Sequence, residues 1–111
     1  NVQSRRASLL ARQGRLDEGI ALIRSLPEDP PDVARAKLLA EAHLLRDQRQ
    51  WPRAYEVLGR AAERFPDDVD LLYEQAMMAE KTDRIDRMEQ LLRRIIEIQP
   101  DHYHAYNALG Y

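Results

Sequence analysis

The side chains of this chain that could do chemistry lie near its C-terminal end, in the triplet His102-Tyr103-His104. Imidazole nitrogens are common ligands of transition metals, so the triplet raises the question of a metal site. Two helical histidines separated by one residue point about 200° apart, however, and are then poorly placed to share one ion. The pattern favours a solvated cap at the start of a helix, with His104 on an open helix face.

Other polar residues give no stronger sign of catalysis or metal binding. His43 lies in a helix-periodic segment without a second histidine nearby. The carboxylate pairs Asp83/Asp86 and Glu97/Asp101 lie in charged segments that lack the burial and convergence of an acid–base pair. The sequence contains no phosphate-binding glycine loop, nucleophile elbow or His-Glu-x-x-His motif. We therefore expect a non-enzymatic chain without a cofactor or metal.

Composition and charge narrow the classes of partner. The chain has no cysteine, which excludes disulfides, thiolate catalysis and Cys-ligated zinc and leaves both oxidising and reducing compartments open. Its formal net charge is −2, so it has no basic field for nucleic acid or anionic membranes. No apolar run approaches the ~18 residues of a membrane helix. We expect no nucleic-acid partner and no direct membrane insertion.

The elements that must position these residues follow a 34-residue repeat. Pro66 and Pro100 stand 34 residues apart, in the phrases "RFPDD" and "IQPDH". Apolar or small residues recur at matching offsets in the two units, as in Leu38 and Leu72, Ala42 and Ala76, and Leu58 and Leu92. Within each unit they are spaced three and four apart on both sides of a polar break, which predicts two helices joined by a turn.

The same template extends in both directions along the chain. It fits the preceding residues if one residue is inserted in the proline-rich link, and it continues past residue 100 as the start of a fourth unit. The predicted repeats are 1–31, 32–66, 67–100 and a truncated first helix at 101–111. The eighth position of each unit is small, which lets paired helices approach closely; these residues are Ala7, Ala42, Ala76 and Gly110.

Helix-start signals stand at the repeat boundaries. Asp32, Asp67 or Asp68, and Asp101 are candidate N-caps, because an aspartate side chain can accept a free backbone N–H of the first helical turn. A chain of 111 residues suits one structural unit. Because it begins at Asn1 instead of Met and ends with half a helix pair, we expect a fragment of a longer repeat protein.

The pattern resembles the tetratricopeptide repeat (TPR) family over nearly the whole chain. The matching residues are Tyr106, Leu109 and Gly110, the link Gly14-Arg15-Leu16-Asp17-Glu18, Ala54, Ala61, and the prolines at 66 and 100. Glu41 and Gln75 depart from it, because they stand where leucine is usual. The resemblance implies an all-α, right-handed superhelical stack of antiparallel helix pairs. It also implies a non-catalytic scaffold that binds a peptide or partner segment in its concave groove.

The resemblance further implies which side chains face the groove, since the family binds through set positions on the first helix of each repeat. Those positions hold Ser4, Ser8 and Arg12; Leu39, His43, Arg46 and Asp47; Asp70, Tyr73, Met77, Glu80 and Lys81; and His104, Asn107 and Tyr111. Tyr73, Met77 and Tyr111 combine apolar area with polar edges, which predicts a partly apolar groove. The acids Asp70 and Glu74 stand where chaperone-binding TPR domains carry cations, which argues against an acidic chaperone tail as the ligand.

Two questions stay open at the level of sequence. The alternative function is a structural or oligomerising segment, in which these side chains cover helix surface or contact further repeats. Weak self-association would then occur through terminal repeat faces. The phrase "PDHYHAYNALGY" is similar to repeats of long bacterial TPR proteins, some of them cell-envelope adaptors. Cytoplasm and bacterial cell envelope or periplasm both remain compatible with the sequence.

Overall fold

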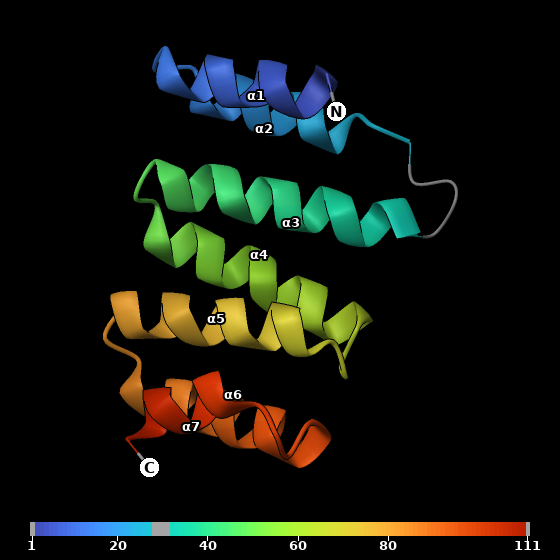
Figure 1. Cartoon of the computed structure of the whole chain (residues 1–111). Coiled ribbons are helices and arrows are strands. Elements are labelled where there is room, and N and C mark those ends of the chain that lie inside the picture. The colour runs from blue at the N-terminus through green and yellow to red at the C-terminus, as the bar shows by residue number, and fades with distance from the viewer. Residues whose placement is uncertain (1, 28–31, 111) are drawn as a thin grey trace. The chain divides into compact units, whose positions relative to one another are not determined.

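The computed structural model describes residues 2–27 and 32–110, and in these ranges it contains seven α-helices and no strand (Figure 1). The helices are α1 (Val2–Arg12), α2 (Leu16–Arg24), α3 (Asp32–Asp47), α4 (Trp51–Arg64), α5 (Val69–Lys81), α6 (Ile85–Ile98) and α7 (Tyr103–Leu109). The predicted all-helical fold class is confirmed. In these ranges, no helix combines the length and the apolar character that crossing a membrane requires. The predicted Asp32 cap and the groove positions of Ser4 and Tyr111 lie outside the described side chains.

Three links between consecutive helices share one backbone conformation. Gly14, Arg49 and Asp83 have φ values of 79°, 59° and 60°, which is the left-handed region. In each link the N–H of the following residue donates to the carbonyl five residues earlier at 2.8 Å. This hydrogen bond is the mark of a Schellman helix end. The three positions are separated by 35 and 34 residues, as the predicted one-residue insertion in the first unit requires.

The chain divides into two compact units, Asn1–Val57 and Leu58–Tyr111, with the boundary inside α4. Chain length alone predicted one structural unit. The difference follows from the repeat, because the main helix contacts, such as α1 with α2 and α5 with α6, join neighbours in sequence.

In the first unit α1 packs against α2, and α3 contacts both. The core consists of small and aliphatic side chains: Ala7, Ala11, Ile20, Ile23, Ala34, Ala42, Leu44, Leu45, Ala54 and Val57. α1 and α2 approach very closely at Gly19 of α2, where an added Cβ would stand 2.7 Å from the carbonyl oxygen of Ala7 in α1. The small residue at the eighth position of this repeat therefore lies at a helix contact, as predicted.

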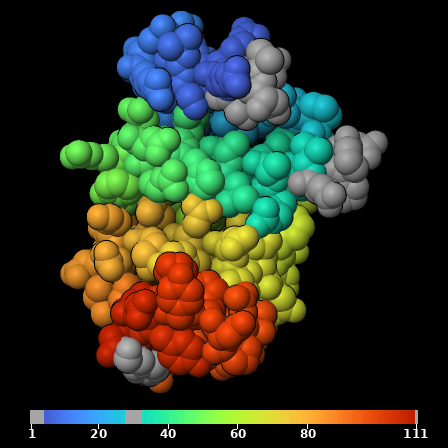
Figure 2. Space-filling view, in the orientation of Figure 1, coloured from blue at the N-terminus to red at the C-terminus, as the bar shows by residue number. Residues whose placement is uncertain are grey.

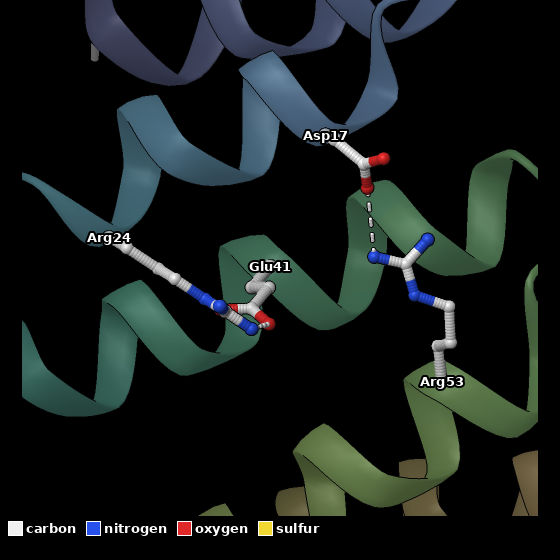
Figure 3. A network of polar contacts seen from close by, with 4 residues as sticks. All are labelled: Asp17, Arg24, Glu41 and Arg53. Carbon is white, nitrogen blue, oxygen red and sulfur yellow. Dashed lines mark hydrogen bonds and ion pairs between the residues drawn. The ribbon is translucent and has the colours of Figure 1, made fainter.

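Ion pairs connect α2 to other helices of the first unit (Figure 3). The Arg24 guanidinium donates Nε–H and Nη2–H to the two carboxylate oxygens of Glu41 on α3, at 2.9 and 2.7 Å. These hydrogen bonds raise the pKa of Arg24. Glu41 is only 4% exposed, so the acid that replaces the usual leucine is buried as a paired carboxylate. Arg53 of α4 donates to Asp17 of α2 at 3.1 Å, an exposed pair that contributes little to stability.

In the second unit α6 packs against both α5 and α7. The core contains Leu58, Ala61, Leu71, Leu72, Ala76, Met78, Ala79, Met88, Leu91, Leu92, Ile95 and Ala105. Small residues of α5 are thus buried in the same core as the larger Met88 and Ile95 of α6, the exchange of bulk that a core of fixed density requires. Gln75, the second departure from the leucine pattern, is 4% exposed, and its Oε1 accepts no hydrogen bond from the described residues.

Asp68 caps α5, which decides between the two aspartates predicted for this position. Its carboxylate accepts the backbone N–H of Leu71 at 3.2 Å. Asp67 instead accepts a hydrogen bond from Arg94 of α6 at 2.8 Å. Asp67 therefore joins the link between α4 and α5 to α6, whereas Asp68 begins α5.

The structure corrects two expectations about α7. Its N-cap is His102 and not Asp101, because the Nδ1 atom of His102 accepts the backbone N–H of Ala105 at 3.1 Å. Gly110, expected at a helix contact, is instead the exposed C-cap of α7, with a left-handed φ of 83°. An added Cβ at Gly110 would meet no atom of the described structure within 4 Å, and within residues 2–27 and 32–110 it is the left-handed φ that favours glycine here.

Candidate functional site

A pocket opens in the first unit at the first helices of two consecutive repeats, α1 and α3. Its volume is about 400 Å³, within the range of sites that hold small ligands or side chains. Ser8 of α1 and Ile23 of α2 contribute to its wall. The rest of the lining comes from α3: Arg35, Ala36, Leu39, Ala40, His43, Leu44 and Asp47. We call this site the α1/α3 pocket.

Helix periodicity explains why one helix supplies most of the lining. Arg35, Leu39, His43 and Asp47 are spaced four apart and therefore form one row along α3. Ala36 and Ala40 line the pocket beside this row, and their short side chains leave space that longer ones would fill. The deepest lining side chains are Ile23 and Leu44, at 2% and 4% exposed, so the pocket has an apolar floor and a polar rim.

The sequence-based groove positions agree only in part with the pocket lining. Leu39, His43, Asp47 and Ser8 line it, whereas Arg46 is half-buried outside the lining, with its guanidinium 3.4 Å from the Asp47 carboxylate. Arg35 was missed. Its position four residues before Leu39 on the same helix face is the signal that would have found it.

In the second unit, two predicted groove residues, Tyr73 of α5 and His104 of α7, come together with two further rings. The ring centroids lie 5.5 Å apart for Tyr73 and His102, 6.4 Å for Tyr73 and His104, and 4.3 Å for Tyr103 and His104. We call these four residues the ring cluster. Tyr103 is 64% exposed, so the cluster reaches the surface. Figure 2 shows α7, in red, on the visible surface of this unit.

The two histidines do not have the divergent placement that two helical residues would have. The expected divergence of about 200° required both residues to be helical. His102 instead precedes the helix, with φ −77° and ψ 85°, and the centroids of the two imidazole rings are 6.1 Å apart. Its Nδ1 atom already accepts the Ala105 N–H. Within residues 2–27 and 32–110, no three His, Asp or Glu side chains form a group able to hold a metal ion.

Of the remaining predicted groove residues with described side chains, Arg12 is exposed at the end of α1, and the others lie on α5 and α7. Asp70, Met77 and Glu80 share a face of α5 with Tyr73 through three- and four-residue spacing. Met77 is half-buried, and the other two are exposed, as is Asn107 on α7. The combined use of these side chains as a binding surface stays a prediction.

The helix pairs, their links and the buried small residues match a known family. Residues 39–103 match a family model described as tetratricopeptide repeat. The chain belongs to the tetratricopeptide repeat family, whose members generally mediate protein–protein interactions and are generally non-catalytic. It is also 35% identical, over 110 residues, to the TPR repeat-containing protein PA4667 of Pseudomonas aeruginosa. That match covers 99% of this chain and 19% of the relative, so the chain spans about a fifth of the relative's length.

Proposed function

We propose that this chain is a non-catalytic module that binds a peptide or partner segment on the first helices of its repeats. The observation that carries this proposal is the α1/α3 pocket, because Leu39 and His43 line a concave site at positions where the family contacts its ligands. An apolar floor beneath a polar rim is typical of protein sites that bury part of a ligand and orient it with a few polar groups.

The ring cluster supports a second contact surface in the second unit. Tyrosine has a large apolar ring with a polar hydroxyl, and such side chains are common among the residues that dominate binding energy. Tyr73 is half-buried and lies beside two imidazole rings, contacts that restrict its side chain before a partner binds. A side chain that is already ordered loses less conformational entropy on binding.

The test begins with recovery of a partner by pull-down, followed by calorimetric titration of that partner. Tyr73→Ala should weaken binding by about 1–3 kcal/mol, the range of a moderate interface hot spot, while the helical circular dichroism is kept. Glu89→Ala is the matched control, because Glu89 is exposed on α6, a second helix of its repeat. If the folded Tyr73→Ala variant and the wild type bind with equal affinity, the ring cluster is not a contact surface.

Self-association is the second candidate function, and exposed apolar side chains favour it. Leu9 on α1 and Tyr103 on α7 are 55% and 64% exposed. Sedimentation over a hundredfold range of concentration separates the two candidates. A mass that rises with concentration in the wild type and stays monomeric in Leu9→Ser or Tyr103→Ser supports self-association through the altered face.

A further inference from the structure

The row of residues that α3 contributes to the α1/α3 pocket changes charge from one end to the other. Arg35 lies in the first turn of α3, and Asp47 is its last residue. Asp47 follows Arg35 by twelve positions, which corresponds to about 18 Å along the helix axis. The helix macrodipole has the same sense, positive near Arg35 and negative near Asp47. A ligand lying along α3 therefore meets a cationic end and an anionic end.

The middle of the pocket is apolar and has room for a bulky side chain. Leu39 lies between Arg35 and Asp47 in the row along α3, and it lines the pocket together with the buried side chains of Ile23 and Leu44. The short side chains of the adjacent Ala36 and Ala40 leave space in this part of the pocket. A pocket of about 400 Å³ admits an aromatic or large aliphatic side chain together with part of its backbone.

We propose that the α1/α3 pocket selects a partner segment with one bulky apolar side chain flanked by an acidic residue on the Arg35 side. This inference rests on the proposed function and adds the chemistry of the ligand. From Arg35 to Leu39 the helix rises about 6 Å, and an extended peptide advances about 3.3 Å per residue. The acidic residue therefore stands about two positions from the apolar one. A basic residue fits three or four positions beyond, near Asp47.

The two charged ends of the α1/α3 pocket contribute unequally to the binding of a ligand. Arg35 is a half-buried residue, and its planar guanidinium with five N–H donors can hold a carboxylate through two hydrogen bonds while it keeps other contacts. The Asp47 side chain is 62% exposed and lies 3.4 Å from Arg46, so solvent and a neighbouring cation weaken its attraction for a ligand. The acidic residue beside Arg35 is therefore the stronger determinant of selectivity.

Three labelled eight-residue peptides test the inference by fluorescence anisotropy with the 111-residue chain. The first has a glutamate, a tryptophan two positions later and a lysine four positions after that, with serine elsewhere. The second exchanges the glutamate and the lysine, and the third replaces the tryptophan with alanine. Wild-type protein should bind the first peptide at least about fivefold more tightly than the second, and the third should bind most weakly. This comparison uses no protein variant, so misfolding cannot affect it.

Two protein variants place the effect in the pocket. Arg35→Glu should reverse the preference between the charge-exchanged peptides, and Ala40→Leu should weaken both by about tenfold or more because the added side chain fills the pocket. Glu89→Ala should bind all three peptides as the wild type does. Circular dichroism confirms that each variant keeps its helices.

The possible failures are distinguishable. Equal wild-type affinity for the two charge-exchanged peptides would overturn the selectivity and leave the proposed binding function standing. A recovered partner that binds Ala40→Leu as tightly as the wild type would overturn the pocket as the site. If neither a partner nor any of the peptides binds, the proposed function fails as well.

Discussion

Replacing Gly19 with alanine should reveal how strongly stability depends on the close approach of α1 and α2. Gly19 lies inside α2, where alanine would normally favour the helix. In this structure the new Cβ would stand 2.7 Å from the carbonyl oxygen of Ala7 and 3.2 Å from a methyl carbon of Leu44. One added methyl group therefore tests the packing of α2 against both α1 and α3.

The expected magnitude is the difference between two opposing effects. Alanine is more favourable than glycine in a helix interior by about 1 kcal/mol. Against this, close C···O contacts in proteins have separations of about 3.3 Å, so the helices would have to separate by about 0.6 Å. Overpacking of a dense core costs about 1–3 kcal/mol, and the upper part of that range applies because the obstacle is backbone. The net destabilisation should be about 1–2 kcal/mol.

Urea titration measures this change with two probes. Circular dichroism reports on all helices, and the fluorescence of Trp51, the only tryptophan of the sequence, reports on the first unit. Gly59→Ala is the matched control, because it is the same substitution inside another helix, α4. Its Cβ would meet only the terminal Nε2 atom of the Gln75 side chain, at 3.1 Å. That amide can rotate, so Gly59→Ala should be neutral or stabilising by up to about 1 kcal/mol.

The opposite signs of the two substitutions are the decisive feature. If Gly19→Ala stabilises the chain as much as Gly59→Ala does, helix propensity alone decides the outcome. The close contact of α1 and α2 would then not limit packing, and the reasoning would be wrong.

Three further predictions concern single substitutions. Arg24→Ala should destabilise the chain by about 1–3 kcal/mol in urea titration, because it removes the bidentate partner of the buried Glu41 carboxylate. Glu41→Leu should change stability by less than about 1 kcal/mol. Equal losses of stability in the two variants would contradict this asymmetry. Asp83→Gly should raise the thermal midpoint and increase the free energy of unfolding by about 0.5–1 kcal/mol, because glycine adopts a φ of 60° without steric cost. An unchanged or lower midpoint would contradict this prediction. His102→Ala should speed hydrogen exchange of the Ala105 amide, because it removes an N-cap worth about 0.5–2 kcal/mol. His102→Asn should retain slow exchange, because asparagine can also cap a helix. Identical exchange rates in the two variants would refute the capping role of His102.

The helices and many of their contacts could be predicted because their causes are local or periodic. The spacing of apolar residues defines helix faces, and the 34-residue period shows that one helix pair recurs. Ala7 and Ala42 were expected at helix contacts and are 0% and 1% exposed. The repeat boundaries, the superhelical stacking and the groove as a whole stay predictions.

Features that depend on contacts distant in sequence were not predictable. No local pattern indicates that Glu41 is buried with Arg24, which lies 17 residues earlier. The α1/α3 pocket needs Ser8 of one repeat beside the alanines of another, so its lining cannot be read from either helix alone. The choice of His102 over Asp101 as N-cap depends on the residue at which the backbone becomes helical, a boundary that sequence patterns define poorly.

The recurring Schellman link also determines where the chain can change length. The 35- and 34-residue separations show one unit accepting an extra residue while its link keeps the same 2.8 Å hydrogen bond. A residue added inside a helix has a different effect, because it rotates everything that follows by about 100° and turns the apolar face away from its partner. Insertions that accumulate between helix pairs can therefore leave the rotational phase of each pair intact. Deletions or insertions within a helix shift that phase, so natural length variation should concentrate outside the three links and the helices they join.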